Sequence, residues 1–148
     1  MQSASTSQAL QFRMSQERDR LVKTWIFAQK LGVGTLGYDR HSWAVDELVD
    51  LAFHQPNALW ELIVRILEID RSEKIVEAIG AGPLEDLIVQ HGAAFIDKVE
   101  RLAALSPAFK TAMQHVWIED GDTPVFKKFY AIAGVTPPSE ANGKRRVG

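Results

Sequence analysis

The sequence has no cysteine, which excludes disulfide bonds and metal sites built on thiolates. It also has no apolar run that approaches the roughly 18–20 residues of a membrane-spanning helix. Residues 1–7 carry neither the basic region nor the apolar region of a secretion signal. We therefore expect a cytoplasmic protein without a membrane partner, and its 148 residues are enough to bury a core.

No segment alternates apolar and polar residues in the manner of a β-strand. Apolar residues instead recur at helical spacing, most clearly across residues 59–67, where they follow the full i, i+3, i+4, i+7, i+8 pattern. The sequence therefore predicts an all-α fold, a compact bundle or short right-handed stack of about seven helices. Helices are expected over about residues 8–30, 43–54, 72–79, 83–91 and 93–105, with others starting at Pro56, Ser106-Pro107 and Thr123-Pro124.

Composition divides the chain into one helical domain and two flanking segments. Residues 1–8 are polar and residues 135–148 form a basic tail, and we expect both to be disordered. Residues 9–134 are the single predicted helical domain, with a glycine hinge at 32–37. Because the hinge lacks the Gly-Lys-Ser/Thr ending of a phosphate-binding loop, it is interpreted as a turn.

Two glycines and a proline mark a second break in the helical pattern. Gly80 or Gly82 is expected to end a helix in the left-handed conformation, and Pro83 to begin the next helix. Glu85 and Asp86 then fall in a first helical turn, where acidic side chains offset the positive end of the helix dipole. A structural capping role is the first interpretation of this acidic pair, and an acidic edge that binds a partner is the second.

A glycine–proline–acid run gives the chain a family resemblance. The run is Gly80-Ala81-Gly82-Pro83-Leu84-Glu85-Asp86-Leu87, followed by His91-Gly92 and later by Val116-Trp117 at the end of a helix. These residues resemble a bacterial domain family of unknown function that occurs in short hypothetical proteins, over about residues 41–118. The resemblance implies an all-helical fold and a bacterial or phage setting. It implies no catalytic residues.

The net charge of −2 conceals an uneven distribution. Residues 1–40 carry six basic and three acidic side chains, a net charge of +3. Residues 41–134 carry eight basic and fifteen acidic side chains, a net charge of −7. An acidic body argues against a broad nucleic-acid-binding face, which needs clustered Lys and Arg, and it suits a basic protein partner. The plainer alternative is that the excess acid keeps a helical protein soluble.

The histidines are the scarcest candidates for chemistry. His41, His54, His91 and His115 show no metal-binding spacing such as HExxH, although Asp50 lies one helical turn before His54. The carboxylates lack an accompanying Glu-x-x-His motif, so we expect no metal site, no cofactor and no catalytic set. An enzyme whose site is assembled by folding from His54, His91 and nearby carboxylates stays open as an alternative.

The tryptophans are assigned by their surroundings. Trp60 lies in the most apolar predicted helix and Trp117 completes an apolar helical stripe, so both are predicted to lie in the core. Trp25 and Trp43 flank the glycine hinge, where packing in the core is favoured over an exposed contact for a partner. Trp43 is nevertheless the aromatic anchor of any acidic surface built on the helix that follows the hinge.

The leading functional hypothesis is a non-enzymatic protein-binding module. In its most concrete form it is a bacterial or phage immunity or inhibitor protein whose acidic face blocks a basic partner. The predicted contact residues are Trp43, Asp46, Glu47, Asp50, Glu85 and Asp86. A further alternative is a self-associating structural subunit with an exposed seam of Phe126, Phe129 and Tyr130.

Overall fold

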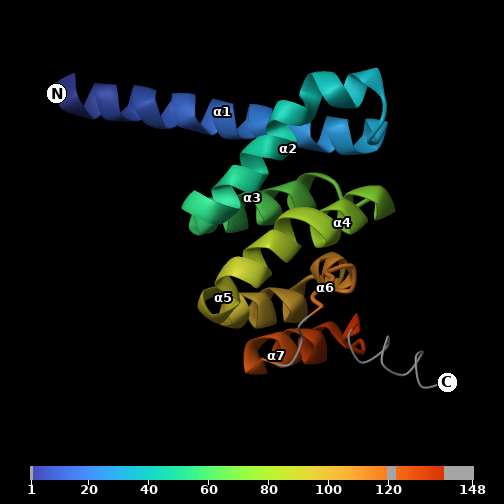
Figure 1. The fold of residues 1–148 in the computed structure, drawn as a ribbon. Coiled ribbons are helices and arrows are strands. Elements are labelled where there is room, and N and C mark those ends of the chain that lie inside the picture. Colours follow the sequence, from blue (N-terminus) through green and yellow to red (C-terminus); the bar gives the residue numbers. More distant parts are fainter. Residues whose placement is uncertain (1, 120–122, 139–148) are drawn as a thin grey trace. The chain divides into compact units, whose positions relative to one another are not determined.

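The computed structural model describes residues 2–119 and 123–138, and the backbone of these residues is helical without a strand (Figure 1). The predicted all-α fold is confirmed. The elements in chain order are α1 (Gln2–Leu31), α2 (Leu36–His54), α3 (Pro56–Ile69), α4 (Glu73–Ile79), the π-helical turn η1 (Gly80–Leu84), α5 (Glu85–Leu105), α6 (Pro107–Met113) and α7 (Pro124–Ala133). No helix of the described residues is both long and apolar enough to cross a membrane.

The chain divides into two compact units, Met1–Glu47 and Leu48–Gly148, called here the N-terminal unit and the C-terminal unit. The boundary lies inside α2 and falls within the predicted single domain. The first helix is longer than expected, because α1 begins at Gln2 and includes residues that were predicted to be disordered. Residues 120–122 and the end of the predicted basic tail lie outside the described residues.

A glycine turn separates α1 from α2 in the N-terminal unit. Gly32 and Gly34 have φ angles of 87° and 94°, in the left-handed region that favours glycine. The Thr35 hydroxyl accepts a hydrogen bond at 3.0 Å from a backbone N–H in the first turn of α2, so Thr35 caps this helix. The predicted hinge is therefore shorter than expected, and α2 begins at Leu36 rather than at Trp43.

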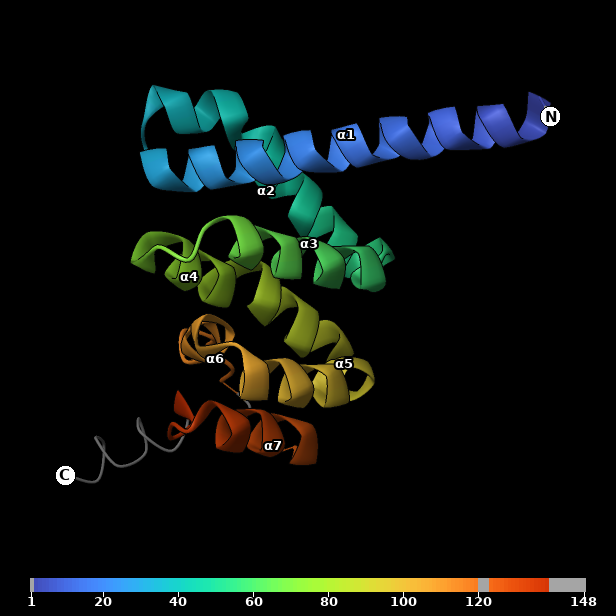
Figure 2. The ribbon, with the colours of Figure 1, turned by 180° about the vertical axis from the view of Figure 1, so that it is seen from behind.

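The C-terminal unit is built around α5. The apolar stripe predicted on α3 is confirmed, because its five members are buried: Leu59, Leu62, Ile63, Ile66 and Leu67. Figures 1 and 2 show α3 on one side of α5 and α7 on the other. Phe129 and Tyr130 of α7 are buried against this unit's core, so the predicted exposed seam of Phe126, Phe129 and Tyr130 is wrong. The aromatic face of α7 serves packing within the chain.

The predicted helix end at Gly80 or Gly82 is also wrong. Gly80 has right-handed helical angles (φ −62°, ψ −46°), and the helix continues through η1 into α5. A Cβ atom at Gly80 would collide with the backbone carbonyl of Ala112 and lie 2.7 Å from the Cβ of His115. The close approach of η1 to α6 thus explains why residue 80 is a glycine. The π-helical turn accommodates Pro83, so no residue needs a left-handed conformation there.

The predicted break at His91-Gly92 is a kink within α5. His91 has non-helical angles (φ −135°, ψ 23°), and helical backbone resumes after it. A Cβ atom at Gly92 would lie 2.9 Å from Cγ1 of Val125, which shows that the N-terminal end of α7 approaches α5 closely there. Two helix starts were predicted correctly, because the side chains of Ser106 and Thr123 accept hydrogen bonds from the backbone of α6 and α7.

The four tryptophans occupy different environments. Trp25 is buried, so its favoured core position is confirmed. The Trp60 ring centroid lies 5.6 Å from that of Phe109, but Trp60 is only half-buried, so its predicted core position is confirmed in part. Trp117 is 51% exposed, so its predicted core position is wrong. The reason is that α6 ends at Met113, followed by a turn at Gln114 and His115, so Trp117 does not lie on the helix. Trp43 is 42% exposed, which contradicts the favoured core position and agrees with the alternative.

Candidate functional site

The acidic pair Glu85 and Asp86 lies where η1 passes into α5, in the C-terminal unit. Because the backbone is helical on both sides of this junction, no free helix N-terminus exists for the pair to cap, and the predicted capping role is wrong. Instead, the Glu85 carboxylate accepts a hydrogen bond of 2.7 Å from the backbone N–H of Trp117. Glu85 therefore ties the start of α5 to the segment that follows α6.

The acidic pair is partly buried, and this changes its ionisation. Burial raises the pKa of Glu85, the hydrogen bond from Trp117 lowers it in part, and the charge of Asp86 raises it further. Burial also raises the pKa of Asp86. Within the described part of the chain, Asp86 has no hydrogen-bond or ion-pair partner. The pair is thus a small concentration of negative charge that the fold itself does not neutralise.

Tyr130 fixes the segment beside the acidic pair. Its hydroxyl donates to the carbonyl of Val116 at 2.8 Å and accepts from the backbone N–H of Ile118 at 2.9 Å. Burial raises the pKa of Tyr130, the N–H of Ile118 lowers it in part, and the charge of Glu85 raises it. This clamp holds residues 116–118 in place, with Val116 and Ile118 buried and the side chain of Trp117 exposed between them.

Trp117 is the candidate contact residue that the sequence reasoning missed. Its exposed indole lies on the residue whose backbone binds Glu85, so an aromatic surface accompanies the acidic pair. No local signal in the sequence marks Trp117, because Val116, Trp117 and Ile118 are all apolar and continue the helical pattern that precedes them. We call Glu85, Asp86 and Trp117 together the acidic edge.

The predicted contact residues of the N-terminal unit lie on α2. Trp43, Asp46 and Glu47 occupy positions i, i+3 and i+4, which place them on one helical face, and all three are exposed. The guanidinium of Arg20 lies 5.1 Å from the centre of the Trp43 ring, so one part of the indole is already in contact with α1. The structure thus brings these three residues together, as predicted.

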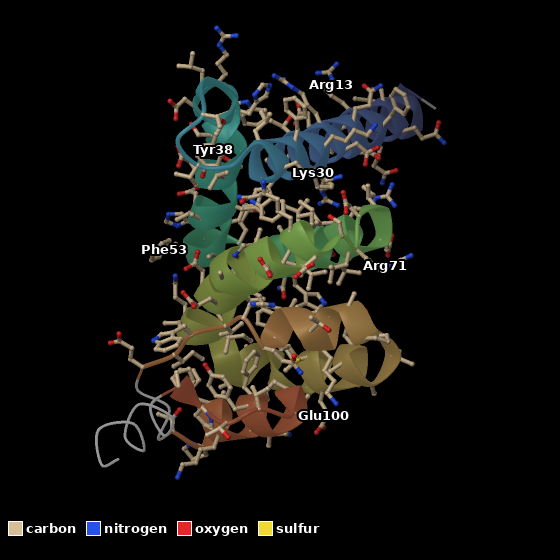
Figure 3. The ribbon with its side chains drawn as sticks, turned by 90° about the vertical axis from the view of Figure 1, so that its right-hand side faces the viewer. Arg13, Lys30, Tyr38, Phe53, Arg71 and Glu100 are labelled. Carbon is tan, nitrogen blue, oxygen red and sulfur yellow. The ribbon has the colours of Figure 1, made fainter. Side chains whose placement is uncertain are left out.

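Asp50, His54 and His91, the last two from the enzymatic alternative, each contact another residue of the C-terminal unit. Asp50 lies 3.5 Å from the imidazole of His54, and both side chains are largely exposed (Figure 3 labels the neighbouring Phe53). The imidazole of His91 donates to the carbonyl of Ala52 at 2.8 Å. In an uninterrupted helix this carbonyl would accept from residue 56, but Pro56 has no N–H. His91 therefore satisfies a carbonyl at the end of α2.

Metal coordination has no candidate among residues 2–119 and 123–138, where no three His, Cys, Asp or Glu side chains gather closely enough to hold an ion. His54 and His91 are held by different partners, an aspartate and a backbone carbonyl. The hypothesis of an enzyme assembled from these histidines and nearby carboxylates stays a prediction.

Residues 34–134 match the sequence model of a family described as "Family of unknown function (DUF6869)". The chain belongs to this family. The predicted membership of a domain family of unknown function is thereby confirmed, and the DUF6869 match is longer than the predicted 41–118. It contains the acidic edge and the exposed face of α2, whereas all of α1 lies outside it. Comparisons with curated proteins and with solved structures found no match.

Proposed function

We propose that the chain is a non-enzymatic protein-binding module that holds a basic partner against its acidic residues. The carrying observation is Asp86, a partly buried carboxylate next to Glu85 for which the described residues supply no cation. Partial burial makes a negative charge less favourable in the free protein, and a lysine or arginine of a partner would remove that disadvantage. The acidic pair is thus better suited to the bound state than to the free one.

Trp117 supports this proposal as an anchor. Tryptophan is enriched among the residues that dominate binding energy, because it buries a large area with few rotatable bonds. Its position next to two carboxylates suits a partner surface in which apolar and cationic groups alternate. Arginine meets both requirements, since its planar guanidinium can stack on an indole and also form paired hydrogen bonds with a carboxylate.

The exposed face of α2 provides further predicted contacts. Asp46 and Glu47 are solvent-exposed on the N-terminal unit, and Asp50 is exposed on the C-terminal unit. Exposed acids of this kind increase the association rate with a basic partner more than they increase affinity. We assign them to electrostatic attraction, and we assign the larger energetic contribution to the acidic edge.

An immunity or inhibitor protein that blocks a basic effector is the specific form of this proposal. The acidic charge of residues 41–134 and the small size of the chain support it. A bacterial or phage setting and a cytoplasmic location belong to the same proposal.

Affinity capture from the native host tests this function. The wild-type chain is compared with the double variant Glu85→Lys/Asp86→Lys at about 50 and 200 mM salt. We expect a basic protein that the wild type retains at low salt, that higher salt releases in part, and that the variant does not retain. Glu77→Gln, an exposed acid on α4, serves as the control and should retain the partner. A partner that the double variant retains equally well would contradict the proposal.

A further inference from the structure

One face of α1 carries a regular series of basic residues. Positions 13, 16, 20, 23, 27 and 30 are separated alternately by three and four residues, which places their side chains in one line along the helix. These residues are Arg13, Gln16, Arg20, Lys23, Phe27 and Lys30, and we call them the α1 stripe. All of them are exposed, and Figure 3 shows Arg13 projecting outward from α1. At 1.5 Å per residue the stripe extends for about 26 Å.

The charge of the α1 stripe has one sign. Its charged members are all basic, and the two acidic residues of α1, Glu17 and Asp19, are not part of the series. Arg13 and Lys23 form no ion pair or hydrogen bond with another residue of the described chain. Positive charge therefore remains available on this face, although the whole chain has a net charge of −2.

Aromatic rings accompany these cations. Phe12, next to Arg13, is 66% exposed, and Phe27, within the stripe, is 52% exposed. The Phe27 ring contacts that of His41 edge-on at 5.0 Å, which leaves much of its surface open. Arg20 rests on the Trp43 ring, and a guanidinium stacked in this way keeps its N–H groups available for a second, anionic partner.

We propose that the α1 stripe binds single-stranded nucleic acid. Cations in a line neutralise successive phosphates, and exposed aromatic rings beside them stack on unpaired bases of any sequence. An acidic protein would satisfy the cations but would leave the exposed rings of Phe12 and Phe27 without a comparable stacking partner. The stripe goes beyond the proposed function, because it has the opposite charge and lies on a helix that the DUF6869 match does not include.

The α1 stripe changes the expectation drawn from composition. The acidic body argued against a broad nucleic-acid-binding face, and the α1 stripe is a narrow one. Summing charges along residues 1–40 hides the line of cations, because Glu17 and Asp19 reduce the total. Both acids border the α1 stripe, since Glu17 lies four residues after Arg13 and Asp19 four residues before Lys23. The stripe itself contains no acidic residue.

The test uses the full chain and a fluorescent oligothymidylate of about 20 nucleotides, with anisotropy as the measurement. We expect binding at about 50 mM salt that weakens as salt is raised, with a slope of log affinity against log salt near −2 for about three phosphate contacts. Arg13→Glu/Lys23→Glu should reduce affinity by about tenfold or more. Phe12→Ala should reduce affinity by at least about threefold without changing the salt slope, because it removes stacking and no charge.

The matched control is Arg101→Glu/Lys127→Glu, which makes the same change in net charge with exposed residues of the C-terminal unit. It should keep most of the affinity, and circular dichroism should show equal helix content for all variants. The proposal is overturned if the oligonucleotide does not bind at low salt, or if the control loses as much affinity as the stripe variant. Binding to polyglutamate as tight as to the oligonucleotide would also overturn it, in favour of an acidic protein.

Discussion

The charged side chains proposed to bind partners lie in different environments in the two units. In the C-terminal unit, Glu85 and Asp86 are partly buried and burial raises the pKa of both. In the N-terminal unit, Arg13 and Lys23 are exposed to solvent. A partly buried, uncompensated charge lowers the stability of the free protein, whereas an exposed charge has almost no effect on it. Stability measurements can therefore locate the first kind of binding surface, but only binding measurements can locate the second.

The glycines of the two units should give the largest contrast. Gly80→Ala places a methyl group against the backbone carbonyl of Ala112, which cannot move without separating η1 from α6. We expect the free energy of unfolding to fall by about 3 kcal/mol or more. Gly34→Ala meets no neighbouring atom within 4 Å and is opposed only by its φ of +94°, so the loss should be about 1 kcal/mol.

Denaturant unfolding followed by circular dichroism measures both glycine variants. A Gly80 variant no less stable than the Gly34 variant would show that η1 and α6 do not approach as closely as described.

Tyr130→Phe should have the next largest effect. The substitution keeps the ring and removes the hydroxyl, which leaves the carbonyl of Val116 and the N–H of Ile118 without their partner. We expect a loss of about 2 kcal/mol in the free energy of unfolding. Tyr38→Phe in the N-terminal unit is the control, since Tyr38 is near the surface and should tolerate the change. Trp117 fluorescence should shift in the first variant, and an unchanged spectrum with unchanged stability would exclude the clamp.

His91→Ala should have a smaller effect. It removes the donor to the carbonyl of Ala52, and Pro56 cannot replace that donor. We expect a loss of about 1 kcal/mol, measured by thermal and chemical unfolding. His91→Gln retains a side-chain N–H and should recover part of the stability. Equal losses in the two variants would show that the hydrogen bond contributes little.

Local signals predicted much of the fold. The stripe of α3 and the starts at Ser106 and Thr123 depend on neighbouring residues, and the structure confirms them. Gly80 shows what local sequence cannot predict. A glycine three residues before a proline has the same local sequence whether it ends a helix or allows another helix to pack closely against it. The close packing depends on Ala112 of α6, and residues near Gly80 in the sequence do not predict that Ala112 lies beside it.

The candidate site was predicted only in part. Glu85 and Asp86 were singled out by position, but the bond from Glu85 to Trp117 joins segments far apart in the chain. The predicted core position of Trp117 depends on a helix that continues to residue 117. The hydrogen bond from Tyr130 to the carbonyl of Val116 holds this segment outside the helix, and it too joins residues that are distant in the chain. The α1 stripe is the opposite case, since its spacing was present in the sequence and was concealed by summing charge over a segment.

The substitution Asp86→Asn should have the smallest effect on stability, and it tests the acidic edge most directly. The raised pKa means that the fold favours the protonated form, so this contribution to stability is fully present below the ordinary value of 3.8 and is lost as the pH rises through the folded-state pKa. Asp86→Asn resembles the protonated form at every pH. The variant should therefore be more stable than the wild type at pH 7, by about 0.5 kcal/mol after allowance for solvent screening.

The first measurement should be the free energy of unfolding of wild type and Asp86→Asn between about pH 3 and pH 8. We predict a gain in stability at neutral pH that disappears toward pH 3, together with a loss of partner in the capture experiment. Arg13→Gln on the exposed α1 stripe should show no such pH-dependent gain. A variant less stable than the wild type at pH 7 would contradict the account, because Asp86 would then be stabilised within the chain and not held available for a basic partner.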